Sequence, residues 1–150
     1  MTDDLSRFVE AQAPLLADVR AELAAGRKRT HWMWFVFPQL RGLGHSSMAH
    51  HFGIASRDEA IAYLAHPVLG LRLRECVELV LSVQGRTAHE IFGSPDDLKL
   101  RSCLTLFHEI DGTDGTDGID GIDGVFGRAL AKYFDGRPDP MTLQLLAAAR

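Results

Sequence analysis

The sequence predicts an all-α protein, folded as a single domain in an irregular multihelical array. Three observations lead to this fold class. Apolar residues recur at helical spacing in several segments, capping residues and prolines separate those segments, and no segment alternates apolar and polar residues as a half-buried strand would. The chain has 150 residues, of which 46% are hydrophobic, and this is enough for one sizeable core.

Each predicted helix has its own start or stop signal. Pro14 and Pro67 suit the first turn of a helix. Residues 56–59 and 87–90 are capping boxes, in which a hydroxyl and a carboxylate three residues later satisfy free backbone N–H groups. The predicted helices span residues 4–11, 14–23, 67–83, 96–109 and 125–134, with shorter helices after the two capping boxes and a last one that starts at Asp139-Pro140.

Residues 111–124 read DGTDGTDGIDGIDG and repeat every three residues. Glycine at every third position is typical of collagen, but the segment has no proline and is too short for a triple helix. Repeated Asp residues raise the question of calcium binding, but they lack the alternate-residue ligand spacing of an EF-hand loop. Because Gly-Asp repeats bury little apolar area, we expect a flexible, solvated insertion between two helices.

Composition limits the classes of function. The net charge is −4 and the pI is near 5.9, so the chain as a whole does not attract nucleic acid or an anionic membrane. The longest apolar run, Trp32–Pro38, is too short to span a bilayer, and the first residues do not form a signal peptide. Cys76 and Cys103 lie in apolar helical patterns without metal-ligand spacing, so we expect buried thiols in a cytoplasmic protein, with no metal and no cofactor.

Residues 26–44, GRKRTHWMWFVFPQLRGLG, contain both tryptophans of the chain, with three cations and a histidine directly before them. From His31 to Gly44 this stretch resembles an uncharacterised bacterial family, a domain of unknown function whose members are sometimes labelled "calpastatin". Residues 59–73, residues 91–107 and the stretch KYFDGRPDPMTL carry the same resemblance, which covers nearly the whole chain. The resemblance implies a compact all-helical domain and no particular activity. Relatives usually have a short connection in place of the Asp-Gly repeat.

The motif HWMWF favours a binding pocket for a small anionic or nucleotide-like ligand. Trp32 and Trp34 would form an aromatic wall beside Lys28, Arg29 and His31, and the cations would hold the anionic group of the ligand. Gln39 would add an amide contact. On a helix the two indoles point about 200° apart, so at most one faces a given cleft. The alternative is that both tryptophans are core residues with satisfied N–H groups.

A second set of candidates lies on the predicted helix 96–109. Asp96, Lys99, Ser102 and Thr105 are three residues apart and form a slowly winding polar stripe. In one interpretation the stripe meets the motif at a concave pocket, where Lys99 binds an anion and the hydroxyls contact the ligand. In the other it is a solvated helix face. In either case the buried side is formed by the apolar residues between them, which are Leu98, Leu100, Leu104, Leu106 and Phe107.

Three classes of function therefore remain. The first is the binding module described above, whose partner is a small anionic ligand. The second is a small hydrolase or transferase, in which His31 is the acid or base and Asp96 or Ser102 assists. The third is a protein-interaction or regulatory domain, which would expose an apolar patch that includes the aromatics of the motif. Net charge disfavours nucleic acid, and the histidines lack the HExxH spacing of a zinc site.

Overall fold

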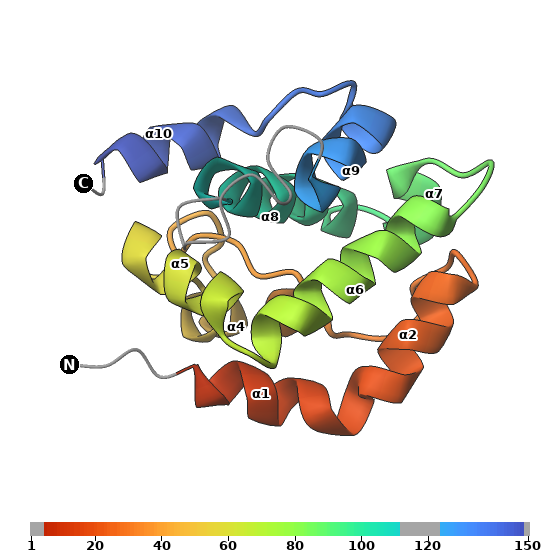
Figure 1. Cartoon of the computed structure of the whole chain (residues 1–150), viewed down its shortest axis with the longest axis horizontal. Coiled ribbons are helices and arrows are strands. Elements are labelled where there is room, and N and C mark those ends of the chain that lie inside the picture. Colours follow the sequence, from red (N-terminus) through yellow and green to blue (C-terminus); the bar gives the residue numbers. More distant parts are fainter. Residues whose placement is uncertain (1–4, 112–123, 149–150) are drawn as a thin grey trace.

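The computed structural model describes residues 5–111 and 124–148, and within those ranges every regular element is helical apart from one isolated parallel bridge between Leu40 and Ile54 (Figure 1). The prediction of an all-α fold is confirmed. The predicted insertion, residues 111–124, lies outside the described residues except for its two end positions. The helices are α1 (Ser6–Gln12), α2 (Leu16–Ala24), α3 (Met33–Val36), α4 (Ser47–His51), α5 (Arg57–Ala65), α6 (Leu69–Ser82), α7 (Ala88–Phe92), α8 (Asp96–Ile110), α9 (Val125–Phe134) and α10 (Pro140–Ala148), with a 3-10 turn η1 (Ala13–Leu15) between α1 and α2.

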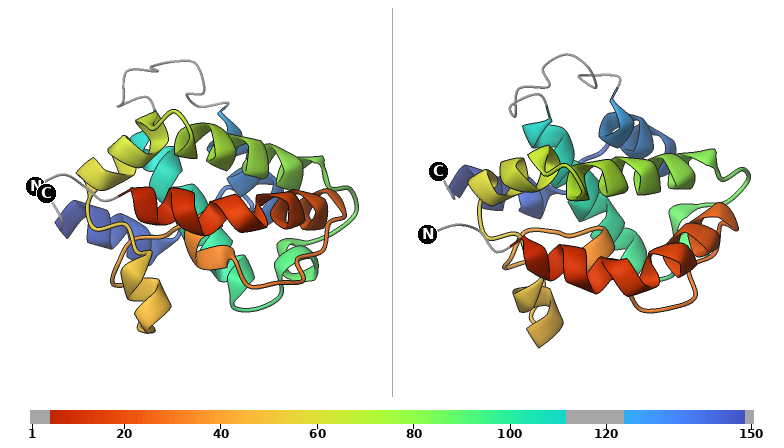
Figure 2. Two further views of the ribbon diagram at one scale, coloured as in Figure 1. Left: turned by 90° about the horizontal axis from the view of Figure 1, so that it is seen from below. Right: turned by 60° about the horizontal axis from the view of Figure 1, so that its bottom comes forward.

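Helix α8 lies at the centre of the packing. It contacts α5, α7, α9 and α10, while α6 crosses the same core and contacts α2, α5 and α9 (Figures 1 and 2). A continuous cluster of buried apolar side chains fills the space between these helices. Burial of this apolar area is the main contribution that stabilises the arrangement.

The predicted capping residues act at two helix starts. Thr87 and Glu90 form the complete capping box at α7. At α5, the Ser56 hydroxyl accepts from the Glu59 N–H at 3.1 Å. The Glu59 carboxylate accepts from the N–H of Ala55 at 2.8 Å, so the second half of this box is shifted by one residue.

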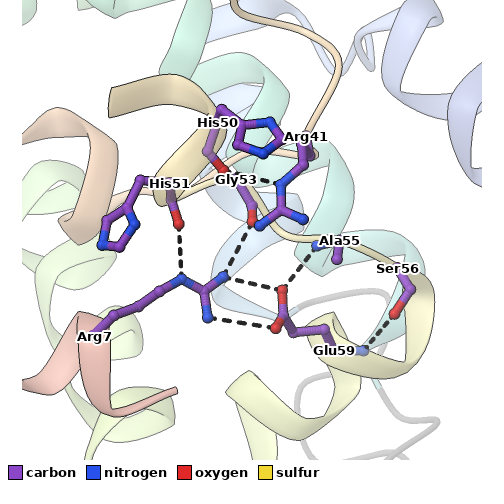
Figure 3. Close-up of polar contacts among 8 residues, drawn as sticks. All are labelled: Arg7, Arg41, His50, His51, Gly53, Ala55, Ser56 and Glu59. Atoms are coloured by element: carbon purple, nitrogen blue, oxygen red, sulfur yellow. Dashed lines mark hydrogen bonds and ion pairs between the residues drawn. The ribbon is translucent and has the colours of Figure 1, made fainter. Parts of the chain in front are cut away.

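An ion pair of the same carboxylate ties α1 to α5 (Figure 3). The Arg7 guanidinium lies 3.2 Å from the Glu59 carboxylate, and both side chains are largely buried. The same guanidinium donates to the backbone oxygens of His51 at 2.8 Å and Gly53 at 3.2 Å. A charge removed from water in this way needs its partner and its hydrogen bonds, and Arg7 and Glu59 supply both.

Cys76 and Cys103 are buried free thiols, as predicted. Burial raises the pKa of Cys76 to about 11 and also raises the pKa of Cys103. Thiols of this kind remain protonated near neutral pH, so their role is in packing. Across the described ranges, no helix has both the length and the apolar character needed to cross a bilayer.

Candidate functional site

Glu22 of α2 holds the start of the HWMWF motif. Its carboxylate accepts from the N–H of Arg29 at 2.7 Å, the N–H of Thr30 at 3.1 Å, the Thr30 hydroxyl at 2.7 Å and the Trp32 indole N–H at 3.0 Å. Burial favours the neutral carboxyl, but these four donors outweigh burial and lower the pKa of Glu22 to about 2. Sequence reasoning missed Glu22, because its position in an ordinary helix gives no sign of these donors.

The two tryptophans have different environments. Trp32 is fully buried and packs against Phe37 and Phe92, so it is a core residue with a satisfied N–H group. Trp34, within the single turn α3, is partly buried and lines a surface hollow of about 300 Å³. One indole therefore faces the hollow and the other the core; Trp32 precedes α3 and has a non-helical backbone, so the helical spacing considered in the sequence does not apply to this pair.

This first hollow lies between the motif and the beginning of α8. It is lined by Lys28, His31, Met33, Trp34, Ser94, Pro95, Asp96 and Lys99. Five of the residues singled out in the sequence therefore line one concave surface, although they come from two segments far apart in the chain. His31 is exposed on this surface.

The two lysines of the first hollow both pair with the Asp96 carboxylate. The Lys28 ammonium lies 2.9 Å from one oxygen of Asp96, and the Lys99 ammonium lies 3.7 Å from the other. Lys28 is 7% exposed and also donates to the Thr30 carbonyl at 2.6 Å. Lys99 is 24% exposed and lies 5.1 Å from the centroid of the Trp34 ring. Two ammonium groups and one carboxylate leave an excess of one positive charge at this surface.

A second hollow, of about 440 Å³, adjoins the first and shares Pro95 and Lys99 with it. Its lining consists of Gln39, Leu43, Gly44, Pro95, Leu98, Lys99, Ser102, Asp139 and Met141. The backbone of Gln39 is fixed by the bridge to residue 54, since its carbonyl accepts from the Ile54 N–H at 2.9 Å. The Gln39 side chain lines the second hollow and not the first.

Ser102 and Thr105 hold α10 against α8. The Ser102 hydroxyl lies 3.0 Å from the Asp139 carboxylate, and the Thr105 hydroxyl accepts from the Asp139 N–H at 2.8 Å. Asp139 in turn caps α10 by accepting from the Thr142 N–H at 3.2 Å. Ser102 and Thr105 are buried, so the interpretation as a solvated face is wrong for them. Residues spaced by three wind slowly around a helix, so Thr105 lies about 180° around α8 from Asp96. The Thr105 end of the stripe therefore faces α10.

Leu98 was expected on the buried side of α8, and this expectation is wrong. Leu98 is 57% exposed and lines the second hollow, whereas the other four apolar residues of that set are buried. Leu98 lies one turn before Ser102 on the same face of α8. The start of α10 covers Ser102 and leaves Leu98 open to the hollow.

The motif aromatics do not form the exposed patch expected of an interaction domain. Trp32, Phe35 and Phe37 are all buried. The described residues also contain no group of three His, Cys, Asp or Glu side chains close enough to hold a metal ion. The first and second hollows are therefore the places where the residues predicted from the sequence reach the surface together.

Comparison with known proteins agrees with the fold. Residues 2–146 match a family described as "Protein of unknown function (DUF1810)". The chain is also similar to the crystal structure of the conserved hypothetical protein Rv1873 from Mycobacterium tuberculosis, with 55% sequence identity, 96% of each chain covered and a TM-score of 0.87. A search of curated proteins gave no significant match. The chain belongs to the DUF1810 family, a family of unknown function.

Proposed function

We propose that this protein binds a small anionic ligand in the first hollow, between the HWMWF motif and the first turn of α8. The observation that carries the proposal is the pair of ammonium groups, Lys28 and Lys99, that share the single carboxylate of Asp96 on the wall of this hollow. An anion that enters the hollow neutralises the remaining positive charge. The attraction is stronger there than in open solvent, because the surrounding protein lowers the effective dielectric constant.

Each residue of the first hollow would make a different contact with the ligand. Lys28 is nearly buried and fixed by Thr30 and Asp96, so it supplies a charge in a set position. Lys99 is more exposed and can turn toward a ligand. Trp34 offers an aromatic surface to a planar, nucleotide-like group. Asp96 can accept hydrogen bonds from ligand hydroxyls while it keeps both lysines in place.

A thermal-shift and calorimetry screen tests this proposal. The panel contains inorganic phosphate, sugar phosphates, nucleotides and short carboxylates, all at one ionic strength. A ligand present at about 100 times its Kd stabilises the native state by about 2.7 kcal/mol, which is readily measured as a shift in Tm. Every hit is measured again with Lys28→Met and Lys99→Met, which keep most of the side-chain volume and remove the charge.

The control for these variants is Arg20→Gln, which removes a cation from an exposed pair with Glu75 elsewhere on the surface. We expect binding to weaken at least tenfold in both lysine variants and to stay unchanged in the control. A hit that binds equally well to both lysine variants would show that the first hollow is not the site. No hit in the panel, from a folded protein, would contradict the proposal.

A second candidate function uses the same hollow. We propose that His31, exposed on its lining, acts as acid or base on the bound ligand in a small hydrolase or transferase. Asp96 would then position Lys28 and Lys99 and take no part in proton transfer, since it is already paired with both. His31→Asn should abolish turnover of a ligand found in the screen and leave its Kd within about threefold.

A further inference from the structure

We infer that the ligand is a monoanionic amphiphile, whose carboxylate lies beside Lys28 and Lys99 and whose apolar body extends into the second hollow, over Leu98 and Met141. This inference rests on the proposed function and adds the chemical class of the ligand. It is carried by three observations, which concern the connection between the hollows, the character of the second hollow and the charge of the first.

The two hollows adjoin one another on the surface. Pro95 and Lys99 belong to both linings. A third space, of about 10 Å³, shares Trp34 and Lys99 with the first hollow and Gln39 and Lys99 with the second. A ligand that lies along the Lys99 stem can therefore contact both hollows at once, with its charged end at the ammonium group.

The second hollow is suited to an apolar group. Leu98 is 57% exposed and Met141 is 51% exposed, and both line it together with Leu43. Two of the polar side chains in this lining already have partners, because Ser102 is hydrogen-bonded to Asp139 and the Asp139 carboxylate caps α10. An apolar ligand group would cover the exposed Leu98 and Met141 side chains without breaking the hydrogen bonds of Ser102 and Asp139.

The charge of the first hollow favours a monoanion. Lys28 and Lys99 contribute two positive charges and Asp96 contributes one negative charge. A carboxylate makes the local sum zero, whereas a polyphosphate would place several negative charges next to the Asp96 carboxylate. Like charges at this distance repel, and Asp96 therefore selects against highly charged ligands.

A series of straight-chain carboxylates tests the inference. Binding of acetate, butanoate, hexanoate and octanoate is measured by calorimetry at one ionic strength, with inorganic phosphate and ATP beside them. We expect Kd to fall about twofold to fourfold with each added methylene, since full burial of a methylene stabilises by about 0.8 kcal/mol. We expect octanoate to bind more tightly than ATP.

Substitutions in the two hollows test the contacts of the apolar end and of the charged end of the ligand separately. Leu98→Ser combined with Met141→Ser should reduce the gain per methylene to less than 1.5-fold and leave acetate binding unchanged. The matched control is Leu71→Ser, which changes a leucine of α6 that is 61% exposed outside both hollows. Lys99→Met should weaken the whole series at least tenfold, and Lys99→Arg should restore it. Circular dichroism and Tm check that each variant is folded.

The outcomes distinguish this inference from the proposed function. If phosphate or ATP binds in a manner that depends on Lys99, while octanoate binds no more tightly than butanoate, the inference is overturned and the proposed function stands. If octanoate binds equally well to wild type, Lys28→Met and Lys99→Met, the charge is not used and both are wrong. If no anion of either panel binds, both are likewise overturned.

Discussion

Glu22 is the residue on which the geometry of the motif depends. Its carboxylate accepts four hydrogen bonds from residues 29–32 and so holds the backbone before Trp32 in place. A neutral amide at this position supplies one acceptor oxygen and turns two donors toward the others. We therefore expect Glu22→Gln to lower the free energy of unfolding at pH 7 by about 1 to 3 kcal/mol, measured by urea unfolding.

The pH dependence of stability gives an independent check on Glu22. Its pKa is about 2 in the folded protein, below the ordinary value of 4.5. A lowered pKa in the folded state contributes stability that is complete above the ordinary value and is lost as the pH falls toward 2. The wild type should therefore lose more free energy of unfolding between pH 5 and pH 3 than Glu22→Gln does. Parallel pH profiles for the two proteins would contradict this account.

Among the elements, α1 is joined to α5 by the buried ion pair between Arg7 and Glu59. Arg7→Met leaves the Glu59 carboxylate buried with the Ala55 N–H as its remaining donor among the contacts shown in Figure 3. An unpaired buried charge is costly, so we expect the free energy of unfolding to fall by about 3 to 5 kcal/mol. Urea unfolding at pH 7 measures the change.

The chain offers a matched control for this pair. Arg20 and Glu75 form an ion pair of similar length, 3.4 Å, in which each side chain is 48% exposed. Solvent screens such a pair, so Arg20→Met should change the free energy of unfolding by no more than about 1 kcal/mol. Equal effects of Arg7→Met and Arg20→Met would show that burial of the Arg7 pair does not contribute to the attachment of α1.

The junction between α5 and α6 shows how closely neighbouring helices approach. A Cβ atom at Gly70 would lie 2.1 Å from the Leu64 carbonyl oxygen, so only glycine fits at this point. His66 completes the junction, since its ring Nδ1 accepts from the N–H groups of Val68 and Leu69 at 3.1 and 3.2 Å. These contacts place α6 directly across the core after Pro67.

At the scale of the whole molecule, local signals in the sequence were sufficient for the fold class and for most helix positions. The capping box at Thr87 and the period of α6 are examples, because both are determined by residues three or four positions apart. The exposure of Leu98 and the burial of Thr105 were not predictable in this way. They depend on where α10 lies, and contacts between distant segments determine that position.

In the candidate site, too, some features could be predicted from the local sequence and others could not. Residue chemistry was sufficient to select Lys28, His31, Trp34, Asp96 and Lys99, and the structure places them around one hollow. It did not reveal that Asp96 pairs with both lysines or that Glu22 fixes the backbone beside them. The Lys28–Asp96 pair joins segments that are far apart in the chain, so no pattern within either segment shows that the local Asp96–Lys99 pair gains a second lysine. Glu22 accepts from residues beyond the end of its own helix, and helical periodicity does not extend to them.

The attraction of anions to the first hollow is the central claim, and tryptophan fluorescence tests it without a known ligand. Trp34 lines the hollow, whereas Trp32 is fully buried, so iodide should quench the fluorescence of Trp34 and leave that of Trp32. We predict that Lys99→Met lowers the iodide quenching constant at least twofold, while quenching by neutral acrylamide stays the same. Iodide quenching that is unchanged in Lys99→Met would contradict an anion-attracting hollow.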